Sequence, residues 1–132
     1  MTTGFFTSDQ EPALSLDVIG PDGSQSCDAI IDTGFTGELT LPPDWIEELE
    51  LPYAGVEEMM LADGRFSETA LYDGYVVIDE EAYEVVIAEA PTTPLVGTNL
   101  LWGFSLYLEF QIDGAVEVDS LPSSSRPSRS EK

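Results

Sequence analysis

The sequence AIIDTGFTGELTLPP, residues 29–43, places an acidic residue directly after an apolar run. Two isoleucines lead into Asp32, glycines follow at positions 34 and 37, and two prolines close the stretch. β-Branched residues favour a strand, and Asp and Gly favour a turn, so the pattern predicts a strand that ends at Asp32. Asp32 is then either the cap of an ordinary turn or a carboxylate that the fold holds in place for chemistry.

Alternation of polar and apolar residues, separated by turn signals, extends over most of the remaining chain. Strands are expected within residues 13–20, 26–32, 37–42, 56–79 with a hairpin turn at 62–65, 82–90, and 105–118 with a turn at Asp113 and Gly114. A helix is expected from Pro43 to near Pro52, and a helical turn within residues 94–104. Many short strands with one or two short helices predict an all-β, mainly antiparallel, small closed barrel.

The length of 132 residues and the hydrophobic content of 42% indicate a single domain with one core. We expect this domain to span residues 1–120, and the Ser- and Pro-rich residues 121–132 to form a disordered tail. The sequence has no signal-peptide pattern and no apolar run of about 20 residues, as a membrane span needs. We therefore expect a soluble, cytoplasmic protein.

The chain is strongly acidic, with 26 acidic and 4 basic residues and a net charge of −22. Residues 1–120 contain a single basic residue, Arg65, and carry a net charge of −24. Such a surface repels phosphate groups, which argues against nucleic acid and membrane surfaces as partners. Either the protein binds cationic partners or it is halophilic, suited to a cytoplasm rich in salt. The even spread of the acids along the chain favours the second interpretation.

The absence of histidine excludes Ser-His and Cys-His nucleophile pairs and zinc sites with histidine ligands. Cys27 is the single cysteine and has no cationic neighbour in the sequence, so it is expected to be a buried packing residue. Trp102 and Phe104 are expected to pack in the core. The chemistry left to the chain is that of carboxylate, hydroxyl, amide and backbone groups, and we expect neither a metal nor a cofactor.

Three segments, in this order, resemble the retropepsin-like (retroviral-type) aspartic proteases, specifically the small prokaryotic single-domain members. They are IIDTGFTGELTLP at 30–42, LADGRF at 61–66 and PLVGTNLLWGFSLYLEF at 94–110. The resemblance covers residues 13–118, and the order and spacing of the segments are more specific than any one of them. It implies an acid-protease barrel that acts as a homodimer on a peptide or protein substrate.

By this resemblance Asp32 is the catalytic aspartate, and Thr33 supplies a hydroxyl that bonds across the dimer. Gly34 lets the substrate backbone approach closely. Phe35 completes the active-site loop, where retroviral enzymes have a small residue, and this departure bears on the shape of the substrate subsites. Gly97 is the glycine of a supporting loop beneath the active-site loop.

The resemblance also implies a flap, a hairpin that closes over the bound peptide. Its tip comprises four residues, Ala62, Asp63, Gly64 and Arg65. The Asp-Gly pair is a hairpin turn on any interpretation. Arg65 is expected to be a solvated surface charge rather than a contact to substrate.

Asp-Thr-Gly occurs once in the chain. An aspartic protease needs two carboxylates that share one proton, so the second Asp32 must come from an identical subunit on a two-fold axis. The expected activity is that of an aspartic endopeptidase whose two Asp32 residues activate a water molecule. The alternatives are an inactive dimerisation or peptide-binding module of the same fold, and an unrelated acidic barrel in which Asp32 only caps a turn.

Overall fold

The computed structural model describes residues 1–122 of the chain. It is mostly β, with 55% of residues in strands and 8% in helices. The strands are β1 (Thr2–Phe6), β2 (Pro12–Gly20), β3 (Gly23–Ile31), β4 (Leu39–Leu41), β5 (Tyr53–Met60), β6 (Phe66–Ile78), β7 (Glu81–Glu89), β8 (Leu95–Val96), β9 (Phe104–Leu108) and β10 (Val116–Ser120). The helices are α1 (Pro43–Glu48) and α2 (Thr98–Leu101).

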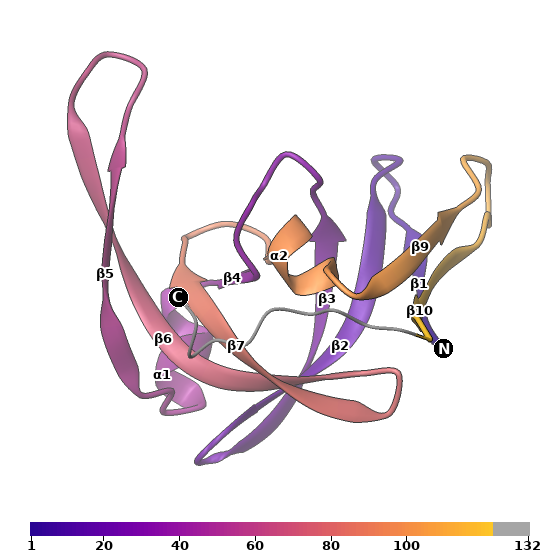
Figure 1. Ribbon diagram of the computed structural model, residues 1–132, viewed down its shortest axis with the longest axis horizontal. Coiled ribbons are helices and arrows are strands. Elements are labelled where there is room, and N and C mark those ends of the chain that lie inside the picture. Colours follow the sequence, from indigo (N-terminus) through magenta and orange to yellow (C-terminus); the bar gives the residue numbers. More distant parts are fainter. Residues whose placement is uncertain (123–132) are drawn as a thin grey trace.

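Six strands close into a barrel in the order β2, β3, β8, β4, β7, β6 (Figure 1). The ring closes because β6 pairs with β2 as well as with β7, through contacts such as Val18 opposite Val76. Closure removes the unpaired edges of these strands. The predicted small closed barrel is confirmed. Most pairings are antiparallel, and the exceptions are β3 with β8 and β4 with β7.

The shortest barrel strand, β8, lies between β3 and β4. It runs parallel to β3, where Ile31 is opposite Val96, and antiparallel to β4, where Leu39 is opposite the same Val96. The loop of residues 32–38 therefore leaves the barrel and returns to it on the two sides of β8. This arrangement brings the loop next to Gly97, which follows β8 directly.

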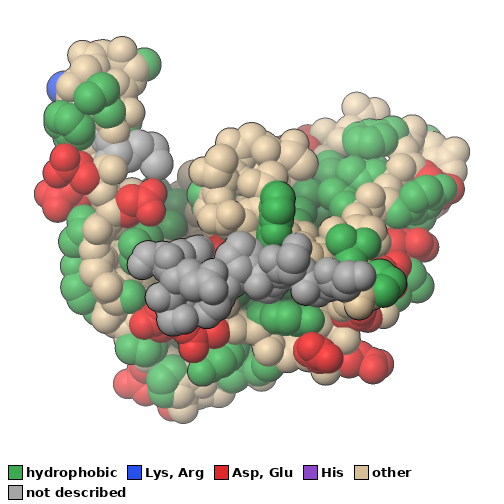
Figure 2. Space-filling view, viewed as in Figure 1, with side chains coloured by type: hydrophobic (Ala, Val, Ile, Leu, Met, Phe, Trp, Pro, Cys, Tyr) green, Lys and Arg blue, Asp and Glu red, His purple; other side chains and the backbone are tan. Residues whose placement is uncertain are grey.

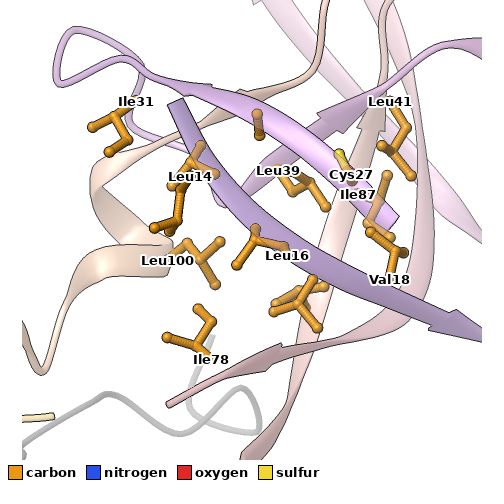
Figure 3. Close-up of a cluster of buried hydrophobic side chains, with 14 of the residues drawn as sticks. Leu14, Leu16, Val18, Cys27, Ile31, Leu39, Leu41, Ile78, Ile87 and Leu100 are labelled. Atoms are coloured by element: carbon orange, nitrogen blue, oxygen red, sulfur yellow. The ribbon is translucent and has the colours of Figure 1, made fainter. Parts of the chain in front are cut away.

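Alternate residues of the long strands fill the barrel interior. Leu14, Leu16 and Val18 of β2 are buried, and their neighbours on β3 include Cys27 (Figure 3). Cys27 is 1% exposed, and desolvation with the nearby Asp28 charge raises the pKa of its thiol to about 12. Its predicted role as a buried packing residue is confirmed. Removing one of the buried leucine side chains would cost about 2–5 kcal/mol of stability.

The hairpin that the sequence predicts is present as β5 and β6, and it projects from the barrel wall (Figure 1). Its longer strand, β6, has 13 residues and belongs to both the hairpin and the barrel. The end near Ile78 pairs with β7, whereas the end near Phe66 pairs only with β5. The predicted final hairpin is likewise present as β9 and β10, and Asp113 in its turn has a φ of 57°.

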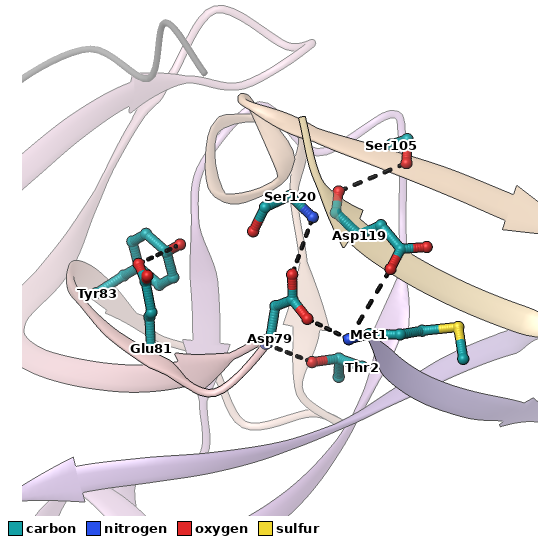
Figure 4. Close-up of polar contacts among 8 residues, drawn as sticks. All are labelled: Met1, Thr2, Asp79, Glu81, Tyr83, Ser105, Asp119 and Ser120. Atoms are coloured by element: carbon teal, nitrogen blue, oxygen red, sulfur yellow. Dashed lines mark hydrogen bonds and ion pairs between the residues drawn. The ribbon is translucent and has the colours of Figure 1, made fainter. Parts of the chain in front are cut away.

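Strand β1 was not expected from the sequence. It pairs with β2 and with β10, so the first residues of the chain join the barrel to the β9–β10 hairpin. The ammonium group of Met1 forms ion pairs with Asp79 and Asp119, and the backbone N–H of Ser120 donates to Asp79 at 3.1 Å (Figure 4). The backbone N–H of Asp79 donates to the Thr2 hydroxyl at 2.6 Å. We call this contact set the terminal latch.

Three details differ from the expectations or extend beyond them. Helix α1 ends at Glu48 instead of near Pro52, because Glu50 adopts a left-handed conformation with φ of 51°. Trp102 is 56% exposed, so only Phe104 packs against the core as expected. The domain's last strand ends at Ser120, and most of the predicted tail, residues 123–132, lies outside the described residues. Within residues 1–122, no helix is long and apolar enough to cross a membrane.

Candidate active site

Asp32 is the first residue after β3, as the sequence predicts. Its backbone N–H donates to the carbonyl oxygen of Val96 at 2.9 Å, which extends the pairing of β3 with β8. Its carbonyl oxygen accepts the N–H of Phe35 at 3.1 Å and closes a tight turn. The backbone of Asp32 is therefore fixed from both sides, and the side chain is half-buried.

The carboxylate of Asp32 is oriented by its own loop. Its Oδ1 atom accepts a hydrogen bond from the backbone N–H of Gly34 at 2.9 Å. A Cβ atom at position 34 would lie 3.2 Å from the same oxygen, closer than ordinary van der Waals contact. Thr33 and Gly34, the two central residues of the turn, are exposed. The turn thus presents one oriented carboxylate beside an uncrowded stretch of backbone.

The beginning of α2 supports this loop from below. Three consecutive backbone N–H groups, those of residues 97–99, donate to carbonyl oxygens of the loop. The bonds run from Gly97 to Glu38 (3.0 Å), from Thr98 to Phe35 (2.9 Å) and from Asn99 to Gly37 (3.2 Å). The sequence places the supporting segment far downstream of the loop, and the structure joins the two.

Gly97 lies so close to the loop that only glycine fits. A Cβ atom at this position would be 2.6 Å from the carbonyl oxygen of Phe35 and would overlap that of Gly37. A Cβ atom at Gly37 would be 2.5 Å from Cζ of the Phe35 ring. The half-buried ring of Phe35 therefore covers the two glycines. The ring packs within its own loop, and this packing explains why the loop holds a large residue at position 35.

Two buried polar residues, one at the end of the loop and one in β4, were not singled out from the sequence. Glu38 and Thr40 are each 6% exposed. The Oε1 atom of Glu38 accepts the backbone N–H of Val86 on β7 at 2.7 Å, and the Thr40 hydroxyl accepts that of Leu95 on β8 at 2.9 Å. Both side chains complete the backbone hydrogen bonding around β4. The available signal for Glu38 was an acidic residue directly before a strand that contains two leucines.

The four residues predicted for the flap tip are exposed at the end of the β5–β6 hairpin. Gly64 has a φ of 87°. The turn requires a positive φ at this position, and glycine adopts it without strain. The Arg65 side chain forms an ion pair with Asp63, with 2.7 Å between Nε and Oδ2. The backbone N–H and the guanidinium of Arg65 lower the pKa of the Asp63 carboxyl. Arg65 is thus on the surface, as expected, and is neutralised within the tip.

The hairpin and the 32–38 loop rise on the same side of the barrel (Figure 1). The space-filling view shows a hollow between the hairpin and the body of the molecule (Figure 2). Asp32, Thr33, Gly34 and Phe35 belong to the 32–38 loop, and Gly97 joins it through its backbone hydrogen bond to Glu38. The residues of the tip belong to the separate β5–β6 hairpin. Across residues 1–122, no group of three or more acidic or cysteine side chains could hold a metal ion.

Compared with known proteins, the chain matches no protein-family model, no curated protein and no solved structure. The barrel, the loop and the hairpin themselves are the basis for a functional assignment.

Proposed function

We propose that the protein is a homodimeric aspartic endopeptidase of the retropepsin-like type, with one Asp32 from each subunit in its active site. The observation that carries this proposal is the support of the Asp32 turn. An ordinary turn cap needs only the bond between Asp32 and the Gly34 N–H. Here the turn is also anchored by the three N–H groups of residues 97–99 and lies beside an open hollow.

The proposed reaction uses two Asp32 carboxyl groups that share one proton across a two-fold axis. The ionised carboxylate takes a proton from a water molecule, whose oxygen forms a bond to the peptide carbonyl carbon. The protonated carboxyl gives its proton to the carbonyl oxygen, producing a neutral tetrahedral diol. The carbon–nitrogen bond then breaks as the nitrogen takes the proton that the first carboxyl received from water, while a hydroxyl group of the diol returns a proton to the second carboxylate. The products are one carboxylic acid and one amine.

The other residues of the loop have supporting roles in this proposal. Gly34 leaves the approach to the carboxylate free of a side chain, and its N–H orients the acceptor oxygen. Thr33 is exposed and able to bond to its counterpart in a second subunit. The hairpin tip of residues 62–65 closes over the peptide and excludes water from the diol.

The test is the substitution Asp32→Asn, which keeps the size of the side chain and the acceptor oxygen. Cleavage of a peptide library in molar KCl should fall by at least about 10²-fold, the typical contribution of acid–base catalysis. The matched control is Asp22→Asn, the same change in the exposed turn between β2 and β3, which should keep full activity. Full activity in Asp32→Asn would refute the proposal. Peptide binding without cleavage by the unmodified protein would instead identify a peptide-binding module.

A further inference from the structure

A separate cleft of about 690 Å³ lies between the turn that joins β1 to β2 and the turn that joins β9 to β10. Its walls include the aromatic rings of Phe6 and Phe110, whose centroids are 5.2 Å apart. Phe110 is 76% exposed, and Ile112 at the rim is 94% exposed. Among the side chains described within residues 1–122, no other large hydrophobic one is as exposed as Ile112. Apolar residues exposed next to a cleft mark an interaction surface.

The turn between β9 and β10, which carries Phe110 and Ile112, is held in one conformation by hydrogen bonds. The side chain of Glu109 accepts the Tyr107 hydroxyl at 2.8 Å and the backbone N–H of Ala115 at 3.1 Å. These two bonds lower the pKa of the Glu109 carboxyl, so the acceptor stays ionised over a wide pH range. The backbone N–H of Gly114 donates to Gln111 at 2.9 Å and completes the turn. The exposed side chains are thus presented by an ordered hairpin, which lowers the entropy cost of binding.

The lining of the cleft carries less acidic charge than that of the hollow beside α1. Asp113 is the only acid among its eight lining residues. A hollow beside α1, in contrast, is lined by acids alone, Asp22, Asp44, Glu47, Glu48 and Glu50. Two copies of a chain with a net charge of −22 repel each other, and the repulsion is smallest where acidic side chains are few. The apolar cleft therefore suits a second copy of this chain better than the acid-lined hollow does.

The position of the cleft relates it to Asp32. Both turns that form it rise on the same side of the barrel as the 32–38 loop and the β5–β6 hairpin, with the loop between them and the hairpin (Figure 1). A copy that approaches this side to bring a second Asp32 to the loop also meets the cleft. A stable interface buries about 1,200 Å² or more, so the loop and the hairpin tip would have to add contact area to that of the cleft.

We infer that the surface formed by Phe6, Phe110 and Ile112 is the docking surface for a second copy of this chain, and that it holds the two Asp32 loops together. This inference rests on the proposed function, because the catalytic site is incomplete without the second copy. In a two-fold arrangement the same surface of each copy packs against that of the other. Ile112 is the anchor residue, since its exposed side chain gains the most from burial.

The experiment compares Ile112→Asp with Tyr75→Asp by sedimentation in molar KCl. Both add one carboxylate at an exposed apolar residue, and Tyr75, 46% exposed, lies on β6 opposite Ile19 and Glu84 in the barrel wall. Ile112→Asp should weaken the dimer at least about 30-fold, as expected for a central interface residue, while Tyr75→Asp leaves it unchanged. Peptide cleavage by Ile112→Asp should recover as the protein concentration is raised.

A second measurement uses cysteine at the same two positions. The native Cys27 is buried, so Ile112→Cys and Tyr75→Cys each add the single accessible thiol. Labelling of the Ile112→Cys variant by a maleimide should slow several-fold between dilute and concentrated protein, whereas labelling of the Tyr75→Cys variant should not change. Equal labelling behaviour of the two variants would overturn the inference. A dimer that persists in Ile112→Asp would also overturn it, and so would an unmodified protein that is monomeric in molar KCl.

The outcomes separate this inference from the proposed activity. A dimer that dissociates in Ile112→Asp, but that cleaves no peptide when unmodified, supports the docking surface and refutes the endopeptidase. A protein that cleaves peptides and stays dimeric in Ile112→Asp supports the endopeptidase and refutes the docking surface.

Discussion

The backbone N–H of Gly97 donates to the carbonyl oxygen of Glu38 at 3.0 Å, so a residue of the chain's last third directly supports the loop that carries Asp32. The approach is possible only because position 97 has no Cβ atom. The orientation of the Asp32 carboxylate thus depends on a backbone contact between the end of β8 and the loop.

Gly97→Ala should destabilise the protein by about 1–3 kcal/mol, the usual cost of forcing an extra group into a packed site. The added methyl group would lie 2.6 Å from the carbonyl oxygen of Phe35, a backbone atom that cannot rotate away. Urea unfolding measures the change. Gly34→Ala is the comparison, because its Cβ meets only the Asp32 Oδ1 atom, at 3.2 Å. It should cost less stability but reduce peptide cleavage, and a Gly97→Ala protein as stable as the unmodified one would contradict the prediction.

Glu38→Ala should destabilise the protein by about 1–3 kcal/mol, because it leaves the backbone N–H of Val86 without its side-chain acceptor. Glu38→Gln keeps an acceptor oxygen and should cost clearly less. Glu48→Ala removes an exposed acid from α1 and serves as the control, with an expected change within about 0.5 kcal/mol. Thermal unfolding of the three variants gives the order, and an equal loss in Glu38→Ala and Glu48→Ala would count against it.

The terminal latch makes stability depend on pH at both ends of the range. The Met1 ammonium group and the Ser120 N–H lower the pKa of the Asp79 carboxyl from 3.8 to about 2. Since the folded pKa is the lower one, this stabilisation is present above about pH 4 and is lost as the pH falls towards 2. The bond to Asp79 raises the pKa of the Met1 ammonium above 8.0, so its contribution is present below pH 8 and is lost as the pH rises through the raised value.

Asp79→Asn tests this pH dependence. The variant should be less stable than the unmodified protein at neutral pH, and the difference should shrink towards pH 2, where Asp79 is protonated in any case. Asp22→Asn, in an exposed turn, should show no such trend. Urea unfolding between pH 2 and pH 7 decides the matter, and parallel pH profiles of Asp79→Asn and the unmodified protein would exclude the latch as the cause.

Dimerisation of this acidic chain should strengthen with salt. Each subunit has a net charge of −22, and raising the salt concentration from 0.1 M to 1 M shortens the Debye length from about 10 Å to about 3 Å. The dissociation constant measured by sedimentation should therefore fall as KCl is added, and peptide cleavage should rise with it. A dimer that is tight in dilute buffer and loosens in molar salt would show that polar contacts dominate the interface instead.

Patterns within short stretches of sequence predicted the strands that have one face in the core and one at the surface. The alternating residues of β2 and the Asp-Gly turns of the β5–β6 and β9–β10 hairpins indicated their positions directly, because period and turn chemistry are local properties. The strand expected within residues 37–42 is present as β4, but its alternation did not indicate that it is buried on both faces between β7 and β8. Glu38, just before β4, and Thr40 within it are polar, yet both are buried.

The candidate site also has a part that the local sequence predicts and a part that it does not. The turn at Asp32 and Gly34 could be predicted, since the two residues are close in sequence. The contact of the loop with residues 97–99 depends on how β8 enters the barrel between β3 and β4, which no local pattern encodes. Strand β1 was missed because its stabilisation comes from pairing with the distant β10 as well as with β2.

The continuity of β6 determines how the hairpin can move. Residues near Val76 are fixed in the barrel wall by β2 and β7, while the same strand continues without interruption to Phe66 beside the tip. On the other strand a bulge between Tyr53 and Gly55, with Gly55 at a φ of 137°, interrupts the pairing at the base of the hairpin. Because β6 runs unbroken from the barrel wall into the hairpin, we expect the tip to move by bending of β6, with the bulge on β5 yielding at the base.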